Sequence, residues 1–332
     1  HMFAFAATAV RLSERARRHG TGHRPGLTAS VHTDVPALTA AYVRRMTGGL
    51  PGAGRLWSPD AAAARLVRGR RDRLLRACDR VLVSTPGELA ELEKVVGAGR
   101  VALLGRGVDR ERFRADRSAR AELARVHGVP ADRPVVLFAG RVDASKRVLL
   151  LAEAVRRVRD RGRPVHLVVA GTGADAPAVR RLLGRDATLL GRVPQEELAR
   201  IYPGCDVFAF PSLTETAGNV VVEAMACGLP VVLPATARTT RWLSAPGEDG
   251  LVVERDDVHG WAEVLTELVD RPQLRAATGA RAAATARRHH RSWPVVLTED
   301  LVPLWHGVAP QAAGGRRSGR GAHGGDGGTE GV

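Results

Sequence analysis

The sequence lacks several features that would place it in a special class of protein. Its 332 residues contain no apolar run of about 18 residues, so we expect no transmembrane helix. The three cysteines, Cys78, Cys205 and Cys227, are far apart and form neither a C-x-x-C pair nor a metal-ligand spacing. No signal-peptide pattern opens the chain. These absences argue against a disulfide scaffold and favour a cytoplasmic protein.

Lysine is also nearly absent, although the chain is strongly basic. Of the 50 Lys and Arg residues, only Lys94 and Lys146 are lysines, and the formal net charge is +15. Residues 1–134 hold 25 basic and 13 acidic side chains, whereas residues 135–306 hold 22 and 20. The excess of positive charge in the first part favours an anionic partner, such as a membrane surface, a nucleic acid or a phosphorylated substrate. The alternative is a solvated, arginine-rich surface.

From about Pro134 onward, short apolar runs alternate with helical stretches. The predicted strands are Val135–Ala139, Val165–Ala170, Thr188–Leu190, Asp206–Phe210, Pro230–Leu233 and Leu251–Val253. The predicted helices are Leu149–Arg161, Ala176–Leu183, Gln195–Tyr202, Asn219–Ala226 and Trp261–Asp270. Continuous apolar strands that alternate with helices predict an α/β fold with a parallel sheet covered on both faces.

The first 133 residues show less of this pattern. We predict helices at Phe3–His19 and Ala61–Ala77, and strands at Leu27–Val31, Arg80–Ser84 and Val101–Leu104. We therefore expect an N-terminal domain over 1–133, a second domain over 134–290, and a helix over 291–306 that packs back toward the first domain. Residues 307–332 are rich in glycine and lack large apolar side chains, which predicts a disordered tail.

One glycine-rich segment has part of the pattern of a dinucleotide-binding site. Residues 171–176, Gly-Thr-Gly-Ala-Asp-Ala, follow a predicted strand and precede a predicted helix, as the dinucleotide-binding fingerprint does. That fingerprint requires an acid at the end of the next strand to hold a ribose, but the next strand ends in Leu190, Gly191 and Arg192. We therefore interpret residues 171–176 as a tight turn and expect no NAD.

Two carboxylates eight positions apart mark the strongest candidate site, within Pro211–Ala226. Glu215 follows a predicted parallel strand, where the ligand crevices of α/β proteins lie. Gly218 allows close backbone approach, and Gly218 and Asn219 open a helix whose free N–H groups favour a phosphate. Glu223 suits a vicinal diol, because a carboxylate accepts two hydrogen bonds. Taken singly, Glu215 also fits a surface acid and Glu223 a helix-dipole acid.

A second candidate site lies in the loop after the first strand of this domain. Arg141 and Lys146 are five positions apart, in a loop that leads into a helix. Two cations in this arrangement can clamp a diphosphate, although a solvent-facing pair is the alternative. Lys146 is one of only two lysines, which favours a need for a compact ammonium group there.

Together, these motifs resemble the retaining glycosyltransferases of the GT-B architecture, specifically family 4, over roughly residues 27–306. The motifs that carry the resemblance are Gly140-Arg141 with Lys146, Gly191-Arg192-Val193, Glu196-Glu197-Leu198, Asp206-Val207, Pro211-Ser212, Glu215, Glu223-Ala224-Met225-Ala226 and Gly228-Leu229-Pro230-Val231-Val232. Two N-terminal motifs, His32-Thr33-Asp34 and Arg106-Gly107-Val108-Asp109 with Phe113, are similar to the branch that includes GDP-mannose-dependent α-mannosyltransferases and sulfoquinovosyl-lipid synthases.

The resemblance implies two Rossmann-like βαβ domains that face a cleft and bind a nucleotide-sugar donor. Arg141 and Lys146 would hold its diphosphate, Glu215 its sugar and Glu223 its ribose. Backbone near Val193 would contact the base. A fold of this kind is an α/β fold in which the first domain, here incomplete, faces the acceptor.

The implied reaction is transfer with retention by a front-face route. The departing diphosphate would be stabilised by Arg141, Lys146 and the helix dipole at Gly218, and it would take the proton of the acceptor, so that no protein base is needed. His32 would lie near the transferred sugar, although a histidine after a strand is more often structural. The chain has no Asp-x-Asp triplet, in agreement with a metal-independent site, and no cofactor is expected.

The donor and acceptor follow from the resemblance only in outline. Mannose from GDP-mannose is our first expectation for the donor, and UDP-hexoses remain open. The acceptor is a hydroxyl group of a lipid, a glycan or a small metabolite.

The sequence also departs from the family. Ala217 stands where an aromatic residue is usual, and 237–240 replaces a Gly-Gly turn. The opening strands and the glycine-rich acceptor-side loop of the family have no counterpart. These departures leave an alternative, a catalytically impaired GT-B-like protein that binds a membrane surface or a nucleic acid.

Of these two anionic partners, the sequence favours the membrane. Seven arginines between Arg65 and Arg80 suit an anionic membrane surface, so we expect a cytoplasmic protein that is peripheral at the inner face of the membrane. A nucleic acid is not expected, because no nucleic-acid-binding module is recognisable and the basic part has few aromatic residues for base stacking.

Overall fold

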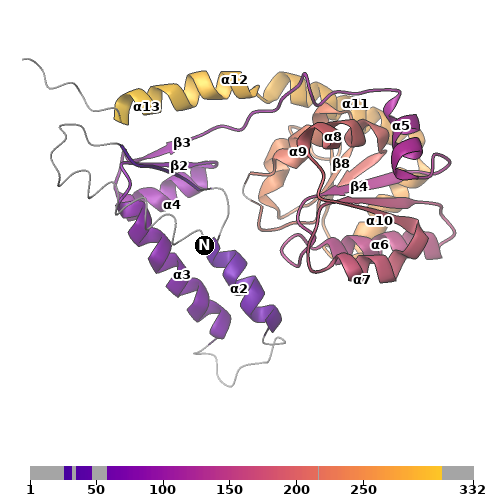
Figure 1. The fold of residues 1–332 in the computed structure, drawn as a ribbon, viewed down its shortest axis with the longest axis horizontal. Coiled ribbons are helices and arrows are strands. Elements are labelled where there is room, and N and C mark those ends of the chain that lie inside the picture. The colour runs from indigo at the N-terminus through magenta and orange to yellow at the C-terminus, as the bar shows by residue number, and fades with distance from the viewer. Residues whose placement is uncertain (1–25, 32–34, 47–57, 216, 309–332) are drawn as a thin grey trace, which may run out of the picture.

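The chain folds into two α/β units that a C-terminal helical segment bridges (Figure 1). This architecture comes from a computed structural model, which describes residues 26–31, 35–46, 58–215 and 217–308. The predicted helix at Phe3–His19 and the predicted tail beyond residue 308 lie outside the described residues.

The N-terminal domain is built on three parallel strands in the order β1-β2-β3. Its elements are β1 (Thr28–Ser30), α2 (Val35–Met46), α3 (Pro59–Arg76), β2 (Arg80–Val83), α4 (Pro86–Val96) and β3 (Val101–Leu103). A proline begins both α3 and α4, and Thr85 caps α4 by accepting the N–H of Glu88. The small core of this domain consists of Leu75, Cys78, Val81, Val83, Leu92, Val96 and Val101.

The C-terminal domain contains a six-stranded parallel sheet in the order β6-β5-β4-β7-β8-β9. Its strands are β4 (Val135–Ala139), β5 (His166–Ala170), β6 (Ala187–Gly191), β7 (Val207–Ala209), β8 (Val231–Pro234) and β9 (Leu251–Val253). Every residue of β4 and β5 is buried, which explains why both read as continuous apolar runs. All six strands were predicted from the sequence and are confirmed.

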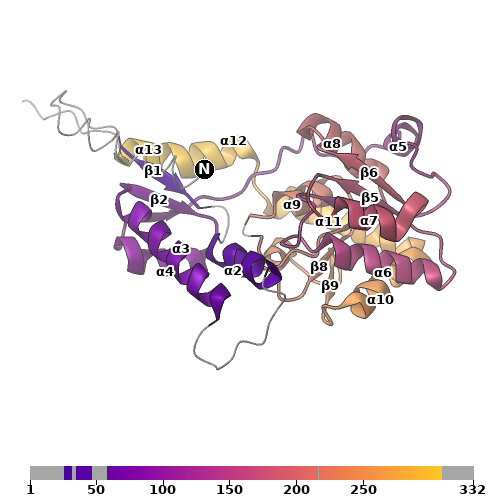
Figure 2. The same cartoon turned by 60° about the horizontal axis from the view of Figure 1, so that its bottom comes forward.

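Helices cover both faces of this sheet (Figures 1 and 2). One face carries α6 (Val148–Asp160), α7 (Ala176–Leu183) and α10 (Val258–Asp270), and the other carries α8 (Gln195–Ile201), α9 (Asn219–Ala226) and α11 (Pro272–His289). Three short 3₁₀ helices, η1 (Gly184–Asp186), η2 (Tyr202–Gly204) and η3 (Arg238–Trp242), lie in the connections. The five predicted helices are confirmed as α6 to α10.

The segment before β4 contributes to the second domain. Val108, Phe113, Leu123 and Val129 all belong to the C-terminal core, although the sequence places them in the first domain. Phe113 lies edge-on to the ring of Tyr202, with 5.8 Å between the ring centroids. Helix α5 (Ala119–His127) in this segment packs against η2 and α8. The chain therefore changes domain near Val108 rather than at residue 134.

The glycines of the turn at residues 171–176 have a packing role. A Cβ atom on Gly171 would lie 1.8 Å from the carbonyl oxygen of Gly140, and one on Gly173 would lie 2.1 Å from that of Val142. This turn therefore lies directly against the backbone of the loop that follows β4. Close backbone contact therefore accounts for both glycines.

The C-terminal segment returns to the N-terminal domain. Helix α12 (Trp293–Val296), the π-helical turn η4 (Leu297–Leu301) and α13 (Val302–Val308) run across the N-terminal sheet (Figure 1). Asp300 Oδ2 accepts the Gly105 N–H at 2.7 Å and pairs with Arg291 Nη2 at 2.6 Å. The hydrogen bond from Arg291 lowers the pKa of Asp300, so this carboxylate holds the two domains together in its charged form.

Replacement of Gly107 by alanine tests this junction. A Cβ atom at Gly107 would lie 2.5 Å from the Trp293 backbone nitrogen and 2.9 Å from the Ser292 carbonyl carbon, and these backbone atoms have little room to adjust. We expect Gly107→Ala to lower the free energy of unfolding by about 1–3 kcal/mol in urea titrations. The control is Gly69→Ala in α3, where nothing lies within 4 Å, and it should raise stability by about 0.5–1 kcal/mol. Equal effects of the two variants would contradict the packing described here.

Candidate functional site

The order of the strands places two loops side by side. The chain runs from β4 outward to β5 and β6, then returns to β7 beside β4 and continues to β8 and β9. Neighbouring connections therefore leave β4 and β7 in opposite directions, and a crevice forms beyond the carboxyl ends of these two strands. The loop after β4 carries Arg141 and Lys146, and the loop after β7 carries Glu215.

Lys146 and Glu215 form an ion pair at this crevice. Lys146 Nζ lies 2.5 Å from Glu215 Oε2, and the two side chains are only 12% and 20% exposed. The Lys146 ammonium also lies 5.6 Å from the centroid of the Phe210 ring, a cation–π contact. Residues 69 positions apart in the sequence are thus joined, as expected of two parts of one site.

Glu215 also organises the start of α9. Its Oε1 atom accepts the N–H groups of Ala217 and Gly218, each at 3.2 Å. Burial tends to raise the pKa of Glu215, but the charge and hydrogen bond of Lys146 and these two N–H groups bring the pKa below its usual value. The prediction of a free N–H group at Gly218 is therefore wrong for this structure, because this N–H group donates a hydrogen bond to the Glu215 carboxylate.

Gly218 has the backbone conformation that favours glycine. Its φ angle is +66°, and a Cβ atom there would lie 2.6 Å from Thr239 Cγ2. The Trp242 indole N–H donates to the carbonyl oxygen of Ala217 at 3.0 Å. Helix η3 occupies the position of the Gly-Gly turn that is usual in the family. It packs against Ala217, which stands where the family usually has an aromatic residue.

Two polar atoms near the start of α9 have unmet hydrogen-bonding capacity. Within the described residues, Asn219 Oδ1 and Thr239 Oγ1 are buried and have no hydrogen-bond partner. Buried polar atoms are usually satisfied by protein, water or ligand. These atoms fit a site that receives polar groups from a ligand.

Glu223 faces a different part of the domain. It is 8% exposed, and it accepts hydrogen bonds from Tyr202 Oη at 3.3 Å and Gln195 Nε2 at 3.4 Å. Burial raises its pKa. Gln195 comes two residues after the half-buried Val193, in the connection after β6, so this connection reaches Glu223 through Gln195. Sequence reasoning missed Tyr202 and Gln195, which show no pattern that distinguishes them.

Arg141 lies at the rim between the domains. Its side chain is 54% exposed, and it contacts Asp143 Oδ2 at 3.1 Å and Ser145 Oγ at 3.2 Å. Tyr42 Oη, from α2 of the N-terminal domain, donates to the same Asp143 carboxylate at 3.2 Å. Burial tends to raise the pKa of Asp143, but Ser145, Arg141 and Tyr42 hold it below its usual value. No sequence pattern marks Tyr42, which reaches the site only across the cleft.

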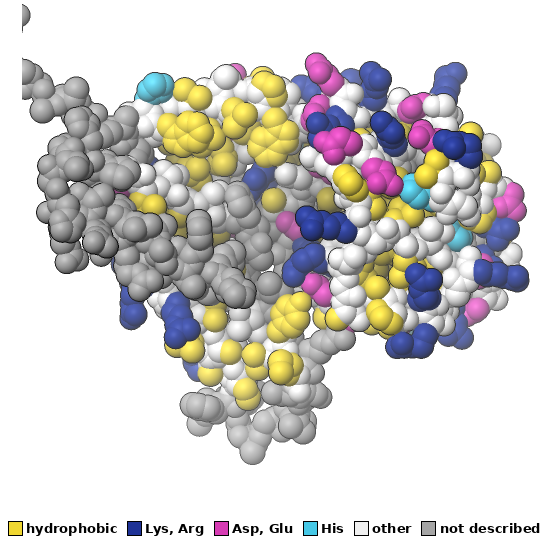
Figure 3. All heavy atoms as spheres, in the orientation of Figure 1, with side chains coloured by type: hydrophobic (Ala, Val, Ile, Leu, Met, Phe, Trp, Pro, Cys, Tyr) yellow, Lys and Arg dark blue, Asp and Glu magenta, His cyan; other side chains and the backbone are white. Residues whose placement is uncertain are grey.

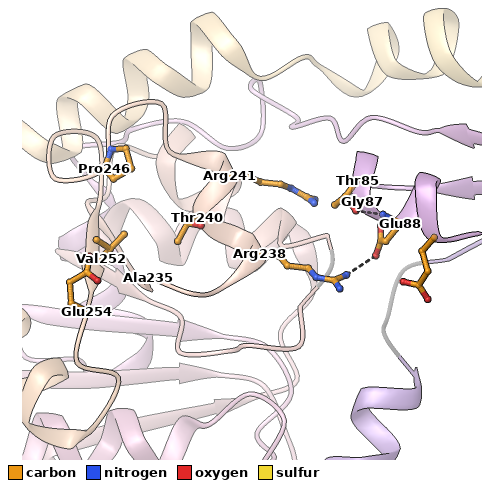
Figure 4. A pocket seen from close by; sticks show the side chains of 11 residues that line it. Thr85, Gly87, Glu88, Ala235, Arg238, Thr240, Arg241, Pro246, Val252 and Glu254 are labelled. Atoms are coloured by element: carbon orange, nitrogen blue, oxygen red, sulfur yellow. Dashed lines mark hydrogen bonds and ion pairs between the residues drawn. The ribbon is translucent and has the colours of Figure 1, made fainter. Parts of the chain in front are cut away.

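A cavity of about 770 Å³ lies between α4 and the C-terminal domain (Figure 4). Its lining residues are Thr85, Gly87, Glu88, Glu91, Ala235, Arg238, Thr240, Arg241, Pro246, Val252 and Glu254. Arg238 Nη1 pairs with Glu88 Oε1 across the cavity at 3.2 Å, and Arg241 extends toward Thr85 (Figure 4). The segment that departs from the family pattern therefore forms one wall of the cleft.

Arg106 contributes a further cation to the same cleft. Its Nη2 atom donates to Ser84 Oγ at 2.7 Å. Burial lowers the pKa of Arg106, while the negative charges of Glu215 and Glu88 oppose that shift. Arg106 was identified from the sequence only as part of an Arg-Gly-Val-Asp motif, without an assigned role. The structure places it on the N-terminal side of the cleft.

Some sequence predictions concern features that the structure does not describe or does not contain. His32 lies outside the described residues, so its role at the site stays a prediction. In the described ranges, no group of three or more His, Cys, Asp or Glu side chains is arranged to hold a metal ion. A helix long and apolar enough to cross a membrane is also absent from these ranges.

A double-mutant cycle tests the ion pair at the crevice. Lys146→Met leaves a largely buried carboxylate without its partner, and we expect it to lower the free energy of unfolding by about 3–5 kcal/mol at neutral pH. The double variant Lys146→Met/Glu215→Gln should recover part of this loss, with a coupling of about 1–3 kcal/mol in urea titrations.

The same cycle has an expected pH dependence. Folding lowers the pKa of Glu215, so the pair stabilises the protein fully above the unfolded glutamate pKa of about 4.3. That contribution is lost as the pH falls through the lowered folded pKa. The destabilisation by Lys146→Met should therefore shrink in acid. Additive single effects, or no change with pH, would contradict the pairing.

Comparisons with known proteins agree with this geometry. The family model described as "Glycosyl transferases group 1" matches residues 133–271. The D-inositol 3-phosphate glycosyltransferase of Xylanimonas cellulosilytica is 35% identical over 230 residues, which cover 64% of this chain and 54% of that protein. D-inositol 3-phosphate glycosyltransferase 2 of Catenulispora acidiphila is 35% identical over 255 residues, which cover 72% and 58%. The chain thus spans just over half the length of these curated relatives.

Solved structures show the same fold. Sucrose-phosphate synthase from Thermosynechococcus elongatus superposes with a TM-score of 0.68 at 23% identity, over 92% of this chain and 78% of that one. HepE from Anabaena, in complex with UDP and glucose, gives a TM-score of 0.65 at 18% identity, over 89% and 73%. Residues 133–271 therefore match the glycosyl transferases group 1 family, and the two domains together have the GT-B fold.

Proposed function

We propose that this chain is a glycosyltransferase that moves a sugar from a nucleotide-diphosphate donor to a hydroxyl group. The observation that carries the proposal is the Lys146–Glu215 pair, which lies where the strand order reverses and beside the start of α9. This pair combines a cation for a diphosphate with a carboxylate for sugar hydroxyls. Its position in the segment that matches the family model supports the same conclusion.

In the proposed complex, the donor diphosphate replaces two carboxylates as the ion-pair partner of the cations in the crevice. It takes Lys146 from Glu215 and Arg141 from Asp143, and Glu215 then accepts hydrogen bonds from the sugar. The N–H groups of Ala217 and Gly218, which Glu215 now occupies, become available to phosphate oxygens.

The nucleoside part of the donor lies on the α8 side of the domain. Glu223 accepts the ribose hydroxyls in place of Gln195 and Tyr202, which now donate to it. Backbone near Val193 contacts the base. Gln195, which contacts this carboxylate, lies two residues after the half-buried Val193, and this supports that arrangement.

We propose transfer with retention along a front-face route. The bond between the sugar and the diphosphate breaks, and a bond between the sugar and the acceptor oxygen forms on the same face. The departing phosphate oxygen takes the acceptor proton. Lys146, Arg141 and the amino end of α9 stabilise the negative charge that develops on the diphosphate, and no metal or other cofactor enters this proposal. His32 is proposed to lie near the transferred sugar.

The donor proposed first is GDP-mannose, on the resemblance of the two N-terminal motifs. UDP-hexoses compete with it, because the structurally similar HepE was solved with UDP and glucose. For the acceptor we propose a phosphorylated small metabolite, rather than a lipid or a glycan. The names of the curated relatives support this choice, as do Arg106, Arg238 and Arg241 in the cleft.

Calorimetry in metal-free buffer tests the donor site. The ligand panel is GDP, UDP, GDP-mannose, UDP-glucose and UDP-N-acetylglucosamine. We expect Lys146→Ala to weaken binding of the bare nucleotide by at least about tenfold, because it removes a charge-assisted contact. The matched control is Lys94→Ala, the other lysine of the chain, which is exposed in the last turn of α4.

Two glutamate variants separate the roles in the donor site. Glu223→Ala should weaken binding of the bare nucleotide about tenfold. Glu215→Ala should leave that binding unchanged and remove the extra affinity that the sugar contributes. The reverse pattern would contradict these assignments. Absence of binding to every nucleotide in the panel would contradict the proposed function and favour the alternative of a protein that binds anionic partners without transfer.

A further inference from the structure

The outer face of α3 carries a row of arginines. Arg65, Arg70, Arg73 and Arg76 are all exposed, and their spacing places them on the solvent side of this 18-residue helix. Within the described residues, none of the four forms an ion pair with an acid, and only Arg76 donates a side-chain hydrogen bond, to the Val95 carbonyl oxygen. In the space-filling view, a few basic side chains are visible at the lower left edge of the N-terminal domain (Figure 3).

The acids near this helix are already engaged by other arginines. Arg71, which is only 14% exposed, pairs with Asp72 at 2.9 Å and with Glu91 at 3.3 Å. Asp60, at the start of α3, pairs with Arg44 of α2 at 2.9 Å. The positive charge of the outer face is therefore left without neutralising side chains among the residues described.

Apolar side chains accompany this cationic face. Leu66 lies within the row and is 62% exposed, and Met46, at the end of the neighbouring α2, is 86% exposed. A helix that presents arginines together with exposed apolar side chains suits the interface of a lipid bilayer. No aromatic side chain occurs in α3 to stack on a base, so a nucleic acid fits this face less well.

We propose that the outer face of α3, defined by Arg65, Leu66, Arg70, Arg73 and Arg76, docks the protein on a membrane surface rich in anionic lipid headgroups. The helix lies along the surface over its length of about 27 Å, and Leu66 enters the headgroup region. The C-terminal domain, whose part of the sequence is nearly neutral, remains in solution. This docking does not depend on the transfer reaction, because no residue of the crevice takes part.

Vesicle sedimentation of the full chain tests the proposal. We expect binding to vesicles of phosphatidylcholine with phosphatidylglycerol, no binding to phosphatidylcholine alone, and release at high salt. Replacement of Arg65, Arg70, Arg73 and Arg76 by glutamine should lower the partition coefficient by about fivefold for each arginine, which amounts to several hundredfold in total.

The matched control removes the same charge elsewhere. Arg180, Arg181, Arg185 and Arg288 are exposed on the C-terminal domain, and their replacement by glutamine should leave partition within about threefold of the original. Circular dichroism and thermal unfolding check that both variants fold. Three outcomes would overturn the proposal: equal loss in the two variants, equal binding to neutral vesicles, or a salt-sensitive gel shift with DNA or RNA without vesicle binding.

Discussion

The reversal of strand order between β4 and β7 is the constraint on which the candidate site depends. It places two loops that are far apart in the sequence at the same edge of the sheet, where Lys146 meets Glu215. Because both side chains are largely buried, each needs the other, and removal of one leaves a desolvated charge. Glu215 in turn binds the N–H groups at the start of α9, so one pair of charges shapes both loops and the helix.

Three of the cations in the cleft already have carboxylate partners. The three pairs are Arg141–Asp143, Lys146–Glu215 and Arg238–Glu88. An anionic ligand that binds these cations would have to displace their carboxylate partners. Its affinity would then depend on the difference between the contacts that it gains and those that it replaces. Two of the carboxylates also connect the domains, since Asp143 accepts from Tyr42 and Glu88 pairs with Arg238. Ligand exchange at these positions would change contacts between the domains as well as within the crevice.

Much of the C-terminal domain is predictable because its strands and most helices have strong local patterns. Helix α11 was missed because alanine, threonine and glycine give it little contrast, and these small residues are needed for close packing: a Cβ atom on Gly279 would lie 2.2 Å from the Gly228 carbonyl oxygen. Helices α2, α4 and α5 were missed as well. Local patterns also do not reveal that Val108 and Phe113 join the second core.

The candidate site shows the same division. Residue types and spacing single out Glu215, Lys146 and Glu223 as candidates, and the structure brings the first two together. Other residues of the cleft could not be predicted, since Tyr42, Glu88 and Tyr202 reach it through tertiary packing alone.

Hydrogen exchange with and without a nucleoside diphosphate, in the presence of a chelator, tests the central claim most directly. The account predicts joint protection of peptides covering 140–147 and 217–226. Protection of only one segment, or of neither, would contradict it.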